Sequence, residues 1–470
     1  MKYRFDPEGR RLPIKLDSTS NAEYAPIPLE ARNRHANALA QEAVSRNARQ
    51  TALGRRDFLV TAAGAATTLL AINEANAQAG KRDGFFDVDA EAGKDFQLAE
   101  ATLGKQEFIF DVQGHYVPPG VAAERKRECA QFDYVSRDYM RCLGADDFVK
   151  DVFLDADTDM MVLSFVPSAR DAEPLTIEEA DATRRIVDEL EGTHRLLLHG
   201  RVNPNQAGDL DGMDELAEKY SVSAWKTYTQ WGPEGKGFYL TDDVGLAFIE
   251  KARALGVKNI CIHKGIPFGR QSYEHSLCTD IGPAAKQFPD VNFLIYHSGW
   301  IPGQAEGPYD PDRGEGLDGL IRSVEQAGLG HGSNVYAELG STWRGLMRDT
   351  DSAAHGIGKL LKHLGEDNVL WGTDSIWYGS PQDQIQAFRS FQIAPEVREQ
   401  HGYPEITADL RAKVFGLNAL RPYGISIEEA RRHAANDRVA RSRQAYAGRR
   451  DPHHLTFGPK TRREFLLFSG

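Results

Sequence analysis

Short apolar runs and amphipathic segments alternate along the chain from residue 108 onward. Strands that alternate with helices in this way predict βα units and a parallel sheet. The apolar runs are Phe108–Val112, Met160–Phe165, Arg195–Leu198, Ser223–Lys226, Asn259–Ile262, Val291–Tyr296, Asn334–Ala337 and Asn368–Trp371. The segments between them include Ile177–Leu190, Val244–Leu255, Leu317–Ala327 and Ala353–Leu364, in which apolar residues recur at i, i+3, i+4 and i+7.

These units predict an α/β fold, a (β/α)₈ TIM barrel. They extend from Phe108 to about Asp374, which is close to the roughly 250 residues typical of such a barrel. A doubly wound open sheet is the alternative. It usually has a glycine-rich phosphate-binding turn after the first strand, and the sequence of 111–115, DVQGH, is not such a turn. The barrel is therefore favoured.

Further segments flank the barrel, which is expected to occupy residues 108–425. A long insertion after the first strand, Tyr116–Asp159, is expected to lie over the C-terminal mouth as a substrate lid, a pocket wall or a dimer contact. Cys129 and Cys142 within it either pair or remain free thiols. Residues 80–107 are expected to be a linker, and residues 426–470 a basic C-terminal tail.

Residues 1–79 are predicted to be a leader with a twin-arginine export signal. Arg55 and Arg56 precede the uncharged run Phe58–Ile72, which is shorter than the about 20 apolar residues that span a bilayer. Small residues then offer cleavage sites after Ala77 or Ala79. Export predicts a periplasmic or secreted protein without a membrane span in its mature form. The alternative is a buried Ala-rich helix in a cytoplasmic protein.

Charge separates the chain into regions. The net charge is -12, but residues 80–420 contain 34 basic and 55 acidic residues, a balance of -21. So acidic a body repels nucleic acid and anionic membranes, which excludes them as main partners and suits an enzyme for a small molecule. The 4 cysteines show no C-x-x-C spacing, so no structural zinc knuckle is expected.

Polar residues follow several of the predicted strands. His115, His263 and His297 come at the ends of the first, fifth and sixth runs, and Asp374 follows the eighth. The C-terminal ends of barrel strands converge on one mouth, so these side chains are expected to meet there. Imidazole and carboxylate groups are suitable ligands for Zn²⁺ or a similar divalent ion. The sequence therefore predicts a metal site, although a single histidine at a strand end is more often structural.

These motifs resemble the amidohydrolase superfamily, in its amidohydrolase-related branch, which includes aminocarboxymuconate-semialdehyde and resorcylate decarboxylases. The motifs that resemble it are Gln113-Gly114-His115, His263, Tyr296-His297-Ser298-Gly299, Trp371-Gly372-Thr373-Asp374 and the closing-helix segment Phe415–Arg421. The resemblance covers roughly residues 108–425. It implies a barrel and an enzyme with one divalent metal ion, with Zn²⁺ favoured and Mn²⁺ as the alternative. Relatives often form dimers, so a homodimer is expected.

The resemblance also implies roles for individual residues. His115, His263 and Asp374 match metal-ligand positions, and His297 matches the histidine that handles protons beside the metal. Gln113 stands where relatives have His or Glu, and its neutral carbonyl oxygen is a weaker ligand than either.

A metal at this mouth supports hydrolysis of an amide, ester or lactone, with Asp374 accepting a proton and His297 as general acid/base. Two alternatives are non-oxidative decarboxylation of an aromatic or unsaturated acid, and a non-catalytic ligand-binding barrel, which Gln113 would favour. Further residues are candidates for substrate binding, although each has an ordinary structural interpretation. They are Lys226, His199, Arg201, Glu338 and Trp300, together with Arg137 and Arg141 in the insertion.

Overall fold

The computed structural model describes residues 6–116, 145–188, 194–268, 271–436, 438–446 and 451–468. Its centre is a sheet of eight parallel strands that follow one another in chain order. The strands are β2 (Phe110–Gly114), β3 (Met160–Leu163), β4 (Leu196–Arg201), β5 (Ala224–Tyr228), β6 (Asn259–His263), β7 (Asn292–Tyr296), β8 (Val335–Glu338) and β9 (Val369–Leu370). Each overlaps one of the predicted apolar runs, so the strand assignment is confirmed.

The last strand returns to the first and brings the sheet round into a barrel. The backbone N–H of Val112 donates to the carbonyl of Trp371 at 3.0 Å, and that of Asp374 donates to Gln113 at 3.0 Å. These bonds join β2 to the segment after β9. The predicted (β/α)₈ barrel is therefore confirmed.

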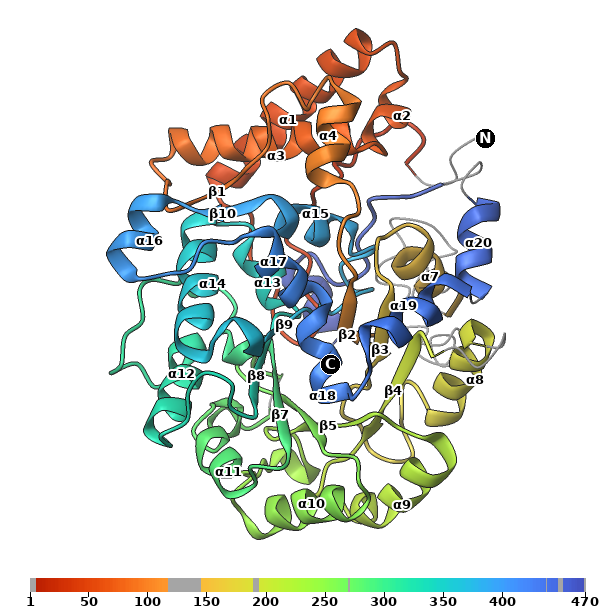
Figure 1. The fold of residues 1–470 in the computed structure, drawn as a ribbon, viewed down its shortest axis with the longest axis vertical. Coiled ribbons are helices and arrows are strands. Elements are labelled where there is room, and N and C mark those ends of the chain that lie inside the picture. Colours follow the sequence, from red (N-terminus) through yellow and green to blue (C-terminus); the bar gives the residue numbers. More distant parts are fainter. Residues whose placement is uncertain are drawn as a thin grey trace.

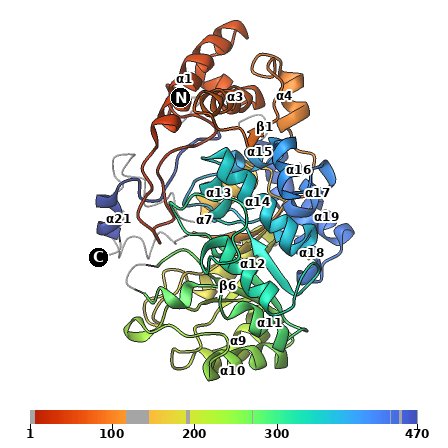
Figure 2. The same cartoon turned by 90° about the vertical axis from the view of Figure 1, so that its left-hand side faces the viewer.

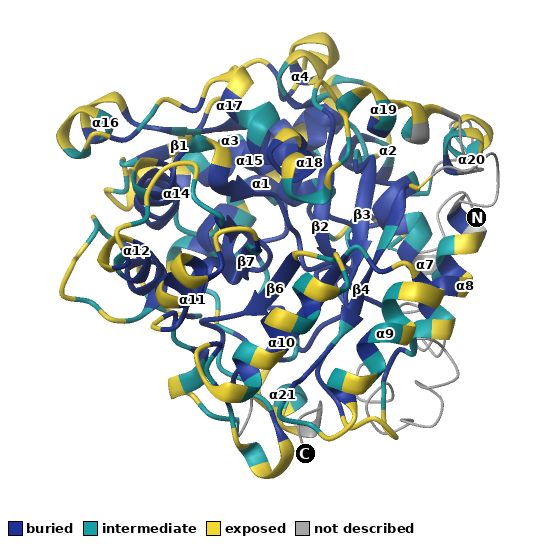
Figure 3. Cartoon of the chain, turned by 60° about the horizontal axis from the view of Figure 1, so that its bottom comes forward, coloured by how far each residue is buried: buried dark blue, intermediate teal, exposed yellow. Residues whose placement is uncertain are grey.

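Helices surround the strands (Figure 1). The main helices between and after the strands are α7 (Ala145–Val149), α8 (Ile177–Asp188), α9 (Asp209–Tyr220), α10 (Asp243–Ala254), α11 (Ile281–Gln287), α12 (Gly316–Gln326), α14 (Thr350–Leu364) and α15 (Gln382–Ser390). In α14, Ile357, Leu360, Leu361 and Leu364 are almost completely buried, which is the helical spacing of an inward stripe. Figure 3 shows the result, with strands buried and the outer faces of many helices exposed.

The barrel interior is apolar at the end opposite the candidate site. Phe110 and Leu294 from the strands belong to one buried cluster with Ala419 and Leu420 of α18 (Asn418–Tyr423). This helix thus packs against strand residues, as the resemblance of Phe415–Arg421 implied. Because this end of the barrel is filled with apolar side chains, polar side chains gather at the other end, where the strands terminate.

The predicted linker is folded. Residues 80–107 contain β1 (Gly84–Phe86) and α4 (Phe96–Leu103), and β1 pairs antiparallel with β10 (Phe391–Ile393). The prediction of a linker was therefore wrong, because Phe86 buries its side chain against the barrel body at Phe391. A segment of three strand residues is too short to be distinguished from a loop by its sequence pattern.

Residues 31–78 form three packed helices, α1 (Ala31–Gln50), α2 (Arg55–Leu59) and α3 (Ala62–Gln78). Both arginines of the predicted export signal have partners within the fold: Arg55 donates to the carbonyl of Gly9 at 2.8 Å, and the buried Arg56 donates to that of Pro452. Phe58 is fully buried, and α3 has the form of the Ala-rich helix named as the alternative. Export stays a prediction. None of the helices in the described ranges combines the length and the apolar character that a bilayer-spanning helix requires.

The two ends of the chain run together over the barrel. Residues 426–470, expected to be a tail, contain the helices α19 (Ile427–Asn436), α20 (Arg438–Tyr446) and α21 (Arg462–Phe468). Leu455 and Phe457 are buried, and the carbonyl of Pro459 accepts the N–H of Ser20 at 3.0 Å. Figure 2 shows the red N-terminal and dark blue C-terminal segments on the same side of the molecule. Buried apolar residues therefore anchor this basic C-terminal region to the rest of the described chain.

Candidate functional site

The predicted histidines and the aspartate meet at the C-terminal ends of the strands. His263 ends β6, His297 follows β7, His115 follows β2 and Asp374 follows β9; all four are buried. His297 Nε2 lies 3.2 Å from His263 Nδ1, and His115 Nε2 lies 3.2 Å from Asp374 Oδ1. Parallel strands in register give this convergence, although up to 259 residues separate the partners in the sequence.

The backbone turns sharply at these positions. His297, Ser298, Ser341 and Asp374 have φ values of 66°, 52°, 55° and 56°, in the left-handed region that non-glycine residues seldom adopt. Hydrogen bonds hold the turn after β7: the Glu338 carboxylate accepts the N–H of His297 at 3.0 Å, and Ser298 Oγ donates to the Glu338 carbonyl at 2.7 Å. Such strained turns persist where the surrounding structure fixes them, and they are common at active sites.

Hydrogen bonds to backbone carbonyls fix the tautomers of His263 and His297. His297 Nδ1 lies 2.7 Å from the carbonyl of Gly340, and His263 Nε2 lies 3.0 Å from that of Ile266. A carbonyl oxygen only accepts, so these two nitrogens hold the ring hydrogens. The other nitrogen of each ring, His263 Nδ1 and His297 Nε2, therefore carries a lone pair, and these two lone pairs face each other. Tyr228 stacks on the His263 ring with centroids 4.4 Å apart and keeps it in place.

A carboxylate from the N-terminal region lies beside the two lone pairs. One ligand atom each from Glu23, His263 and His297 lies within 4.8 Å of the others. Burial lowers the pKa of His297 to about 4 and that of His263 well below its usual value, so both rings are neutral. Burial and then the nearby Asp374 raise the pKa of Glu23. The two ring nitrogens that face each other carry no hydrogen, and the raised pKa of Glu23 favours its protonated form. A divalent cation bound here would displace that proton, because metal ligands are deprotonated.

Asp374 is an ionised carboxylate at the centre of the site. Its oxygens accept from Gln113 Nε2 at 3.1 Å, from Asn21 Nδ2 at 2.8 Å and from Ser341 Oγ at 2.5 Å. Burial opposes ionisation, but the hydrogen bonds with His115 and Ser341 hold the pKa of Asp374 below its ordinary range. Gln113 thus donates to the carboxylate through its nitrogen. Its Oε1 is buried and has no hydrogen-bond partner in the described part of the chain.

Lys226 places a buried amine near these carboxylates. It belongs to β5, and burial lowers its pKa to about 8. Its Nζ lies 3.9 Å from the ring centroid of Tyr296 and 4.7 Å from that of Tyr228, as in cation–π contacts. It has no hydrogen-bond partner among the described residues. His199 lies close by, with Nε2 3.2 Å from the Tyr296 hydroxyl.

Other predicted substrate-binding residues have structural partners. Arg201 pairs with Glu173 at 3.0 Å and with Asp209 at 3.1 Å, and neither belongs to the histidine cluster. The Glu338 carboxylate holds backbone N–H groups, and burial raises its pKa to about 8. Trp300 is buried and meets the Tyr24 ring edge-on at 6.0 Å. Arg137, Arg141, Cys129 and Cys142 lie outside the described residues.

Three residues that were not predicted contact the cluster directly, namely Asn21, Glu23 and Ser341. Asn21 and Glu23 lie in the predicted leader, far from any strand end, and no sequence signal marks them. Ser341 follows β8 by three residues, so a search for polar residues just after each predicted strand could have found it. Its hydroxyl also lies 2.7 Å from that of Tyr378.

The comparisons with known proteins concern mainly the barrel. The family model described as amidohydrolase matches residues 110–425, more than half of the chain. No curated protein matches. Similar solved structures include a 5-carboxyvanillate decarboxylase from Sphingomonas paucimobilis, with 15% identity, a TM-score of 0.40, and coverage of 68% of this chain and 100% of that chain. A zinc-bound amidohydrolase from Burkholderia multivorans has 13% identity, a TM-score of 0.38, and coverage of 68% and 100%.

Proposed function

Since the chain belongs to the amidohydrolase family of enzymes, we propose that it is a metal-dependent hydrolase of a small molecule, an amide, ester or lactone. The observation that supports a metal is the pair of facing lone pairs on His263 Nδ1 and His297 Nε2, 3.2 Å apart. Without a cation or a proton between them they repel each other. We propose Zn²⁺ as the ion, since imidazole and carboxylate donors suit it.

A divalent ion held by these residues would act as a Lewis acid and would lower the pKa of bound water toward about 7. The residues around it then have distinct tasks. Asp374 is ionised and accepts a proton, and its Ser341 and Asn21 contacts keep the carboxylate oriented. His297 offers only Nε2 to the site, because Nδ1 is held by Gly340; that nitrogen serves as a ligand or as the proton carrier.

Lys226 is the cationic group of this scheme. Buried among aromatic rings without a hydrogen-bond partner in the described structure, its ammonium stabilises negative charge that develops on a substrate oxygen. The same ammonium favours a second candidate function. A buried cation of this kind binds a substrate carboxylate, as a decarboxylase of aromatic or unsaturated acids requires.

The test is turnover by the full-length protein loaded with Zn²⁺. We expect hydrolysis of members of a panel of amides, esters and lactones, loss of that activity with a chelator, and no CO₂ from aromatic and unsaturated acids. Asp374→Asn should abolish turnover. Release of CO₂ without hydrolysis would replace the first proposal by the second. Absence of stoichiometric metal, with no turnover of any compound, would favour the ligand-binding barrel.

A further inference from the structure

Residues 12–24, called here the N-terminal segment, reach the mouth of the barrel. Leu16, Ser20, Asn21 and Glu23 are buried, with relative exposures between 0% and 6%. This burial is unusual for a region whose sequence pattern predicted a removable leader. The segment is therefore part of the barrel's packing rather than an appendage on its surface.

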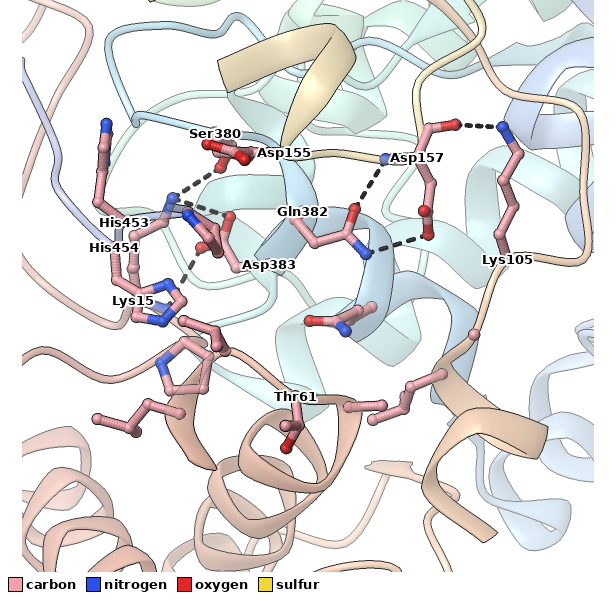
Figure 4. A pocket seen from close by; sticks show the side chains of 18 of the residues that line it. Lys15, Thr61, Lys105, Asp155, Asp157, Ser380, Gln382, Asp383, His453 and His454 are labelled. Carbon is pink, nitrogen blue, oxygen red and sulfur yellow. Dashed lines mark hydrogen bonds and ion pairs between the residues drawn. The ribbon is translucent and has the colours of Figure 1, made fainter. Parts of the chain in front are cut away.

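Two ion pairs anchor the segment before it reaches the site, and the first of them is buried on both sides. Lys15 Nζ donates to the carbonyl of Ser380 at 2.7 Å and lies 3.2 Å from Asp383, beside a cavity of about 140 Å³ (Figure 4). Asp17 pairs with the buried Arg344 at 2.7 Å. A chain fixed at both points presents the next residues in one conformation, because charges are seldom buried unless they are paired.

Asn21 and Glu23 are the residues that the segment delivers. Asn21 Nδ2 donates to Glu23 Oε2 at 2.6 Å and to Asp374 Oδ2 at 2.8 Å, so one amide joins the two carboxylates. Glu23 Oε1 lies 3.6 Å from His263 Nδ1 and accepts from the Tyr228 hydroxyl at 3.3 Å. These contacts orient the Glu23 carboxylate toward the lone pair of His263.

No cation of the described chain forms an ion pair with Glu23. Its side-chain oxygens contact the neutral groups of Asn21, Tyr228 and His263. Lys226 lies close enough to act on it electrostatically, but its Nζ forms no hydrogen bond to it. At the first strand, Gln113 offers no negative charge and donates its amide to Asp374. The site therefore obtains its additional carboxylate from outside the barrel.

We propose that Glu23 is a metal ligand of this site, together with His263 and His297, and that the N-terminal segment is a permanent part of the active centre. The ligand set then combines two strand ends with a segment that precedes the barrel by more than 80 residues. Asn21 is a positioning residue, since it holds Glu23 and Asp374 in fixed relation. The proposal rests on the proposed function only for the existence of a bound metal.

The test measures metal binding directly. Full-length wild type, Glu23→Gln and the control Glu30→Gln are loaded with Zn²⁺, and the dissociation constant is measured by competition with a chromophoric chelator. Glu30 precedes α1 and its side chain is 64% exposed, so it is a matched carboxylate outside the site. Loss of an outer partner of a ligand costs about 10- to 100-fold in affinity, so loss of a ligand should cost at least about 100-fold. The control should match wild type.

Two further measurements separate the possible failures. The visible spectrum of the Co²⁺-loaded protein should change in Glu23→Gln and not in Glu30→Gln, and circular dichroism checks that each variant is folded. If Glu23→Gln does not fold, Glu23→Asp retains the charge, and a Co²⁺ spectrum identical to wild type would overturn the assignment. Tight binding lost in His263→Ala but kept in Glu23→Gln would overturn this inference alone. Wild type without stoichiometric metal would overturn the proposed function as well.

Discussion

Replacement of Lys15 by Met tests whether the N-terminal segment is held by its buried ion pair. The Lys15 side chain is 5% exposed and that of Asp383 is 1% exposed, so solvent hardly screens the 3.2 Å contact between them. Met retains much of the aliphatic stem of Lys15 and removes its charge. The variant therefore leaves Asp383 buried without its cation, while the packing of the segment changes little.

The expected magnitude follows from that burial. Removal of one partner of a buried ion pair costs about 3–5 kcal/mol, because the remaining charge is uncompensated. If the segment bears this cost, the population of molecules with the segment undocked rises by about 10²- to 4 × 10³-fold. An exposed pair contributes much less, about 0–1 kcal/mol. Lys94→Met, in a pair with Glu91 whose side chains are 43% and 65% exposed, is the matched control.

Amide hydrogen exchange measures the opening of the segment in the full-length protein. We expect faster exchange in Lys15→Met for peptides that cover residues 15–24, including the Ser20 amide bonded to Pro459. The double variant Lys15→Met/Asp383→Asn should recover part of the protection, because it removes both charges. Exchange rates equal to those of Lys94→Met would refute the view that this pair anchors the segment.

Three further predictions concern other parts of the molecule. Lys359 is fully buried between the carboxylates of Glu306 and Asp318, at 2.6 and 2.7 Å. Lys359→Met should therefore lower the free energy of unfolding by about 3–5 kcal/mol. A thermal midpoint equal to that of Lys219→Met, a change at an exposed ion pair, would contradict this. His263→Ala should abolish metal-dependent turnover, and surviving activity would disprove the site assignment. Export predicts that a tagged copy of the wild type leaves the cytosol. The variant in which Arg55 and Arg56 are both replaced by Lys should stay in the cytosol. Cytosolic recovery of both forms in cell fractionation would reject it.

Much of the barrel could be predicted because its strands are fully buried. Parallel strands covered on both faces have continuous apolar sequences, and β6, Asn259–His263, differs from the predicted run by one residue. The polar residue that ends such a run then lies at the barrel mouth whatever the intervening helices contain. His263, His297 and Asp374 were found for this reason. Arg201 also follows the rule, yet it pairs with Glu173 and Asp209, since sequence position does not reveal a charge partner.

The contribution of Glu23 could not be predicted for a physical reason. Its place depends on long-range contacts of Lys15 and Asp17 with residues more than 300 positions away, and no local period records such contacts. The uncharged run in α3 could not be assigned from the sequence either. A short Ala-rich segment is compatible with an export signal and with a packed helix, because both require small residues and an absence of charge.

Removal of residues 1–79 and a site completed by Glu23 lead to opposite expectations. Cleavage after Ala77 or Ala79 would deprive Asp383 and Arg344 of their partners Lys15 and Asp17, and Asp374 of the Asn21 amide. Each loss leaves a buried charge or polar group without a partner, at a cost of about 1–5 kcal/mol each. The intact mass of the active protein, isolated from its own cells, shows whether residues 1–79 have been removed or retained. We expect the full-length mass in whichever compartment holds the activity, and active protein that begins after residue 77 would overturn the role of Glu23.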